Sequence, residues 1–165
     1  MCASRSDIYV FNYESLEKGL NALMELPGSD RVREAAKPVS EELLSDTLKL
    51  VPTVPMDTGR LRASGSVFID GQLVKVSSEL GFSSADGTPL KSIGREGKQK
   101  DASVIAVVYN TPYAAAVHEM PATTNWTTEG SGAKYIENTL KERGEHYLKR
   151  WFEAIKSMMQ GQRKK

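Results

Sequence analysis

The fold class is decided by the stretch Ser64-Gly-Ser-Val-Phe-Ile-Asp70-Gly71-Gln72-Leu-Val-Lys-Val-Ser-Ser78. Its two halves are rich in apolar and β-branched residues, and the Asp-Gly pair between them favours a tight hairpin turn. The pattern therefore predicts two neighbouring strands, Ser64–Asp70 and Gln72–Ser78. Apolar–polar alternation is imperfect in both, so the sequence does not fix their register. Farther along the chain, the continuous apolar run Ser103–Tyr109 predicts a third strand, central in the sheet and buried on both faces.

Helical periodicity precedes these strands. Glu14–Glu25 predicts a short helix, and residues from about Arg31 to Leu50 predict a longer one with a single apolar stripe. Pro38 falls inside the longer helix and is expected to kink or divide it, because proline lacks the amide hydrogen and clashes with the preceding turn. At the start of the chain, the apolar run Ile8-Tyr9-Val10-Phe11 is compatible with a strand or a docking arm.

Helical patterns also follow the strands. Pro112–Glu119 predicts a short helix, and residues from about Gly132 to Gln160 predict a long one in which Gly144 permits close packing or a bend. The sequence shows no internal repeat and no second domain. We therefore expect one α+β domain over residues 1–165, with N-terminal helices and a long C-terminal helix packed on a small, mainly antiparallel β-sheet.

The composition of the chain argues against several classes of function. The 165 residues include 22 Lys+Arg and 21 Asp+Glu, so bulk charge does not favour a polyanion binder. The single cysteine, Cys2, cannot form an internal disulfide. No stretch approaches about 18 apolar residues and the N-terminus lacks a signal-peptide pattern, so neither a membrane-spanning nor a secreted protein is expected.

Catalysis and metal binding are not indicated either. The only histidines are His118 and His146, and position 122 is alanine where a zinc-protease helix would need a second histidine. Ser64, His118 and Asp57 could form a triad on paper, but no Gly-x-Ser-x-Gly elbow occurs. We therefore expect no enzyme activity, no metal site and no cofactor.

The polar segment Gly81–Ala102 has no periodicity and too few apolar groups to hold itself against a core. It is expected to be mobile in an isolated subunit. A nucleic-acid-binding module that uses residues 91–100 is an alternative function, because this part is basic. A solvated loop is the simpler interpretation, as is a solubilising role for the basic tail 161–165, since the whole chain is nearly neutral. The candidate DNA contacts are Lys91, Arg95, Lys98 and Lys100.

Two further segments have compositions that no generic fold requires. The first motif is Val54-Pro-Met-Asp-Thr-Gly-Arg-Leu-Arg-Ala-Ser64, between the second helix and the first strand. Its turn predicts that Gly59 adopts a backbone conformation unfavourable to other residues and that Leu61 is buried. The second motif is Tyr109-Asn-Thr-Pro-Tyr-Ala-Ala-Ala-Val-His-Glu119, where a strand runs into a small-residue helix.

With both motifs in this order and at this spacing, the chain resembles the tailed-bacteriophage head–tail joining family. These neck or tail-completion proteins are often labelled minor capsid proteins. Members carry Pro-x-Asp-Thr-Gly-x-Leu-Arg-x-Ser before the strands and Tyr-x-x-x-Tyr-Ala-x-x-Val-Glu after them, and they finish with a C-terminal helix. This chain departs from the second motif in having His118 between Val117 and Glu119, and Met120-Pro-Ala-Thr-Thr replaces the family's Phe-Gly-Thr run. The resemblance covers most of residues 14–160.

The resemblance implies a structural virion protein that forms a ring at the head–tail junction, extends or seals the DNA channel and docks the tail. Its partners would be its own copies, adjacent head-completion or connector and tail proteins, and DNA that passes without sequence-specific binding. It would lie in the virion neck and, during assembly, in the host cytoplasm, without a membrane or cofactor. The motif residues it singles out are Asp57, Thr58, Gly59, Arg60, Arg62, Tyr109, Tyr113 and Glu119. Trp126, a large aromatic on a polar loop, is added as a candidate partner anchor.

Subunit size favours six copies in such a ring. A compact domain of 165 residues has a radius of gyration of about 15 Å and a diameter of about 40 Å. Six touching discs enclose an opening as wide as one disc, which passes a DNA duplex, whereas twelve enclose roughly 110 Å. A hexamer is therefore expected, with heterologous contacts between different faces of neighbouring subunits.

Overall fold

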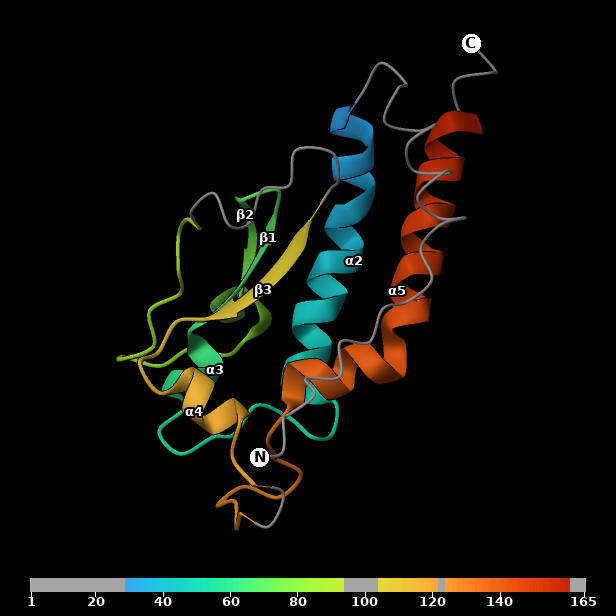
Figure 1. Ribbon diagram of the computed structural model, residues 1–165. Helices are drawn as coiled ribbons and strands as arrows, with labels where there is room; N and C mark the ends of the chain where they lie inside the picture. The colour runs from blue at the N-terminus through green and yellow to red at the C-terminus, as the bar shows by residue number, and fades with distance from the viewer. Residues whose placement is uncertain (1–28, 94–103, 122–123, 161–165) are drawn as a thin grey trace, which may run out of the picture.

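The computed structural model describes residues 29–93, 104–121 and 124–160 (Figure 1). The expected helix Glu14–Glu25, the run Ile8–Phe11 and the tail 161–165 lie outside the described residues. The fold is α+β, as predicted: a small antiparallel sheet and a long C-terminal helix lie on opposite sides of a second long helix. The elements are α2 (Ser29–Lys49), α3 (Arg60–Ala63), β1 (Gly65–Ile69), β2 (Gln72–Val76), the 3₁₀ helix η1 (Ser77–Leu80), β3 (Ile105–Tyr109), α4 (Ala114–His118) and α5 (Tyr135–Gln160).

The hairpin between β1 and β2 has the predicted tight turn. Asp70 and Gly71 both have positive φ, 50° and 80°, which a two-residue turn matching the strand twist requires. The imperfect alternation also has a structural cause. The register shifts in the middle of the ladder, so Val74 is an extra residue on β2 and the pattern changes phase there.

The third strand is placed differently from the prediction. The strand order is β2-β1-β3, so β1 is the central strand of the sheet in the described part of the chain. All five residues of β1 are buried, whereas β3 is only half-buried from Ile105 to Val108. The prediction of a central, doubly buried β3 was wrong, because a continuous apolar run does not distinguish a central strand from an edge strand that helices partly cover.

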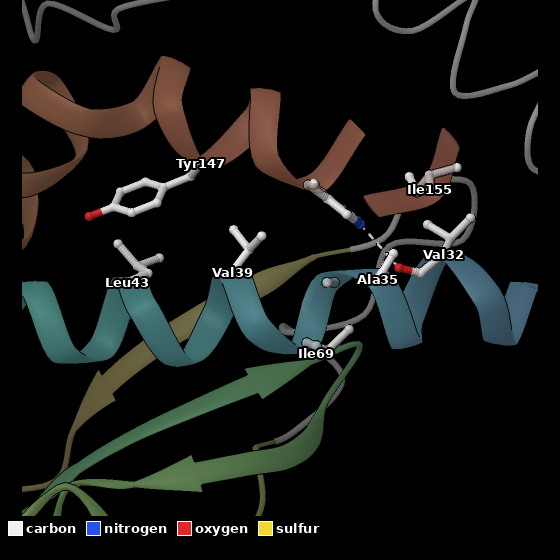
Figure 2. Packing of buried hydrophobic residues seen from close by; sticks show 9 residues of the cluster. Val32, Ala35, Val39, Leu43, Ile69, Tyr147 and Ile155 are labelled. Atoms are coloured by element: carbon white, nitrogen blue, oxygen red, sulfur yellow. Dashed lines mark hydrogen bonds between the residues drawn. The ribbon is translucent and has the colours of Figure 1, made fainter. Parts of the chain in front are cut away.

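The core lies on two sides of α2. Figure 2 shows the row that faces α5, in which Val39 and Leu43 approach Tyr147. The indole Nε1 of Trp151 donates a hydrogen bond of 3.0 Å to the Val32 carbonyl. This bond joins the first turn of α2 to the second half of α5. A second cluster joins α2 to the sheet and to the start of α5 through Leu44, Leu48, Val54, Leu61, Val67, Tyr109 and Tyr135.

Both long helices depart from prediction in detail. α2 continues through Pro38, which lies on its exposed side, so the proline does not divide the helix. α5 begins at Tyr135 rather than Gly132, because the preceding Lys134 has a positive φ of 56°. Figure 1 shows α5 changing direction after its first turns. A β-carbon on Gly144 would meet no atom within 4 Å, so this glycine does not mark a close helix contact.

Candidate functional site

The turn of the first motif has the predicted geometry. Gly59 has a φ of 78° and directly precedes α3. Leu61 is 4% exposed and belongs to the second core cluster, so both predictions are confirmed. The N–H of Ala63 donates to the Gly59 carbonyl at 3.0 Å, which joins the turn and α3 into one unit.

Gly59→Ala is expected to lower the free energy of unfolding by about 1 kcal/mol, because a left-handed φ is unfavourable for a residue with a β-carbon. Crowding adds little, since the nearest atom to the new β-carbon would be Ser84 Cβ at 3.9 Å. Gly144→Ala is the matched control and should raise the free energy of unfolding by about 0.5–1 kcal/mol. Urea unfolding measures both, and a Gly59→Ala protein of native stability would contradict the strain at this turn.

Arg62 points into the domain and joins two loops. Its Nε donates to the Val54 carbonyl at 2.6 Å, and its Nη2 donates to Thr53 Oγ1 at 2.9 Å and to Ser131 Oγ at 3.4 Å. The Thr53 N–H also donates to the Gly130 carbonyl at 2.8 Å. Partial burial lowers the pKa of the Arg62 guanidinium below its ordinary value. Arg62 thus holds the loop of Thr53 and Val54 against the loop of Ser131. We call this set of hydrogen bonds the Arg62 clamp.

Tyr109 is also an internal residue. Its hydroxyl lies 2.7 Å from Thr47 Oγ1 of α2, and its ring stands edge-on to Tyr135 with 5.4 Å between ring centroids. Burial raises the pKa of Tyr109 and raises the pKa of Tyr135 to about 12, so both hydroxyls stay neutral near pH 7. The second motif therefore begins with a residue that fixes the end of β3 against both long helices.

Glu119 is exposed just after α4 and pairs with two neighbours. Its carboxylate accepts a hydrogen bond from Lys134 Nζ and lies 3.0 Å from His118 Nδ1. These two bonds, led by that of Lys134, lower the pKa of the Glu119 carboxyl. The Lys134 N–H donates to the His118 carbonyl at 2.9 Å. Glu119 thus links α4 to the residue that precedes α5.

The remaining motif residues meet in a groove of about 410 Å³ between the first motif, α4 and residues 124–127. We call this the motif groove. Its apolar walls include Met56 and Met120, which are 40% and 38% exposed. The groove brings together five of the predicted site residues: Asp57, Thr58, Arg60, Tyr113 and Trp126.

Two hydroxyls hold the Trp126 loop against the first motif. Thr127 Oγ1 and Thr128 Oγ1 donate to the Met56 carbonyl at 3.2 and 2.8 Å. Sequence reasoning did not single out Met56 or Met120 as site residues. Their positions were the available signal, since Met56 lies inside the first motif and Met120 directly follows the second.

The triad considered from sequence is not formed. Ser64 is fully buried and its hydroxyl donates to the Leu61 carbonyl at 2.7 Å, while Asp57 lies exposed in the motif groove. Within residues 29–93, 104–121 and 124–160, no group of three or more His, Cys, Asp or Glu side chains is arranged to hold a metal ion. No helix in this described part of the chain is long and apolar enough to cross a membrane.

The candidate DNA contacts fall mostly outside the described residues. Lys91 is described and exposed, whereas Arg95, Lys98 and Lys100 are not described. Residues 81–93 contact the domain: Phe82 packs against the second core cluster, and Ser66 Oγ donates to the Leu90 carbonyl at 3.2 Å. The mobility of Gly81–Ala102 in an isolated subunit stays a prediction.

Comparisons of this chain with protein-family models, with curated proteins and with solved structures give no match. The resemblance to head–tail joining proteins is therefore an expectation that rests on the two motifs.

Proposed function

We propose that this protein is a non-enzymatic structural subunit of the tailed-phage head–tail junction, where its copies form a closed ring around the DNA channel. One observation carries the proposal: exposed residues of both motifs, together with Trp126, lie side by side in the motif groove. Residues that serve only the fold have no need to share an accessible surface. Their convergence favours a binding site built from both motifs.

The side chains of the motif groove suit a protein partner. Trp126 and Tyr113 are of the residue types that dominate interface binding energy, and the methionines Met56 and Met120 adapt to irregular partner surfaces. Asp57 and Arg60 add opposite charges to a surface of apolar and neutral polar side chains, which favours one orientation of the partner.

The partner that we assign to the groove is the next copy in the ring. A closed ring uses heterologous contacts, so the groove of one subunit receives a different face of its neighbour. Six subunits remain the expected number. In this arrangement the two rims of the ring are left for the adjacent head-completion or connector proteins and for the tail, and DNA passes through the opening.

Trp126→Ala is expected to prevent ring assembly without unfolding the subunit. Trp126 lines the motif groove and belongs to neither core cluster. Loss of a central aromatic anchor weakens an interface by about 2 kcal/mol or more, and every contact of the ring loses it at once. Light scattering after gel filtration measures assembly, and thermal unfolding checks the fold.

Trp126→Phe is the matched control for this experiment, because it retains an apolar ring in the groove and is expected to assemble. Loss of assembly in Trp126→Ala but not in Trp126→Phe would support the groove as the ring contact. A Trp126→Ala protein that assembles like the native chain would overturn that role.

The alternative function, a nucleic-acid-binding module, has a separate readout. Binding through several phosphate contacts makes log affinity fall steeply and linearly with log salt concentration. We expect only weak binding of duplex DNA by the isolated protein, with a shallow slope. A steep slope that disappears when Lys91, Arg95, Lys98 and Lys100 are replaced by glutamine would favour the alternative.

A further inference from the structure

β3 has an edge without a partner strand among the described residues. Backbone hydrogen bonds at the two ends of its ladder with β1 place Val104 and Asn110 in hydrogen-bonded pairs. Because such pairs alternate along an antiparallel ladder, Ala106 and Val108 also direct their N–H and C=O groups to β1. The residues whose backbone groups point away from β1 are therefore Ile105, Val107 and Tyr109.

A groove runs along this edge between β3 and α5, and it is also lined by Val39 and Leu43 of α2 and by residues of α4. Its lining is mostly apolar but includes the carboxylates Glu119 and Glu137. It consists of two hollows of about 360 and 530 Å³ that share Leu140 as a lining residue. Ile105 and Val107 line it from β3. From α5 it is lined at four-residue steps by Leu140, Gly144 and Leu148, which form one stripe of the helix. We call this the edge groove; its Leu140 is 42% exposed.

We propose that the run Ile8-Tyr9-Val10-Phe11 of the same chain occupies the edge groove and pairs with β3 as a fourth strand. The run consists of β-branched and aromatic residues and has no charge, which suits a strand with a buried face. A strand at this edge satisfies the outward backbone groups of β3, and alternate side chains enter the groove. The four-residue run is one residue shorter than β3, whose five residues are Ile105–Tyr109.

The connecting chain is long enough for this placement. α2 begins at Ser29 and its 21 residues extend about 32 Å. Residues 12–28 lie between Phe11 and Ser29; they span about 40 Å with the expected helix Glu14–Glu25 formed, and up to about 60 Å when fully extended. Phe11 can therefore return to any point along α2, including the level of β3. Docking on its own domain needs no second copy.

Residue-resolved amide hydrogen exchange of the full chain tests the proposal. We expect Val10→Pro to lower the protection of Ile105, Val107 and Tyr109 at least about tenfold, because proline lacks the amide hydrogen and breaks the added ladder. Ala106 and Val108 bond to β1 and should keep their protection. Ala3→Pro, outside the run, is the matched control and should change nothing. Equal protection in the native and Val10→Pro proteins would overturn the proposal.

A second variant fills the edge groove from its α5 side. Gly144→Trp places a large ring where a β-carbon meets no atom within 4 Å, so it should expose the same three amides. Gly144→Ala should not. Repeating the measurement in Trp126→Ala separates this proposal from ring formation. Protection that persists in an unassembled subunit supports docking on the same chain, whereas protection found only in rings would overturn it.

Discussion

Replacing Asp46 with alanine is expected to lower the free energy of unfolding by about 3 kcal/mol. The Asp46 side chain is only 12% exposed and joins α2 to α5. It accepts hydrogen bonds from the Tyr147 hydroxyl at 2.6 Å and from Arg143 Nη1 at 2.7 Å. Removal leaves a buried hydroxyl and a partly buried guanidinium each short of an acceptor, and breaking a fully buried pair costs about 3–5 kcal/mol. Arg143 is 32% exposed and keeps Glu42 as a partner, which places the value at the lower end.

Two control variants isolate the cause of that loss. Asp46→Asn keeps an acceptor for Tyr147 but removes the charge, so we expect a loss of about 1–2 kcal/mol. Glu153→Ala removes an exposed carboxylate from α5 and should change the free energy of unfolding by less than about 0.5 kcal/mol. Urea unfolding gives all three values. An Asp46→Ala protein as stable as Glu153→Ala would show that this contact does not hold the two helices together.

Arg62→Leu is expected to have the second-largest effect, a loss of about 2–3 kcal/mol. Leucine retains apolar volume but removes every hydrogen bond of the clamp. The carbonyl of Val54, a fully buried residue, then loses its 2.6 Å donor, and Thr53 Oγ1 loses a donor at 2.9 Å. Buried acceptors left unpaired cost about 1–3 kcal/mol each, and Ser131 Oγ, 3.5 Å from Thr53 Oγ1, remains as a partner that keeps the sum in this range.

The same substitution should weaken ring assembly. Thr53, held by Arg62, pairs with Gly130, and the two loops they belong to carry the walls of the motif groove. Arg62→Lys retains the charge but lacks the planar fork, so intermediate values of stability and assembly are expected. Urea unfolding and light scattering at one protein concentration measure both. An Arg62→Leu protein of native stability would contradict the clamp.

Much of the fold follows from local sequence signals. The Asp70-Gly71 turn, the apolar stripe of α2 and the buried Leu61 each depend on neighbouring residues alone, and each was predictable. The order of the strands depends on which long-range partners β1 selects, and the apolar run of β3 fits an edge as well as a centre. The start of α5 depends on a positive φ at Lys134, a residue type that seldom adopts it.

The candidate site was predictable in part. The turn at Gly59 and the position of Trp126 on a loop could be inferred from residue type; the role of Trp126 as a partner anchor stays a prediction. Which motif residues are internal and which lie on the surface could not be inferred. Arg62 and Tyr109 are internal because they bond to distant segments, at Ser131 and Thr47. The motif groove likewise forms only when α3 and α4 are brought together in space.

Native mass spectrometry of the purified protein tests the central claim most directly. The account predicts a complex of six copies of the 18.2 kDa chain, which Trp126→Ala reduces to single subunits and Trp126→Phe preserves. Averaged images of the same sample should show a closed ring with a central opening. A protein that stays a monomer at every concentration, or one that forms twelvefold rings, would contradict the account.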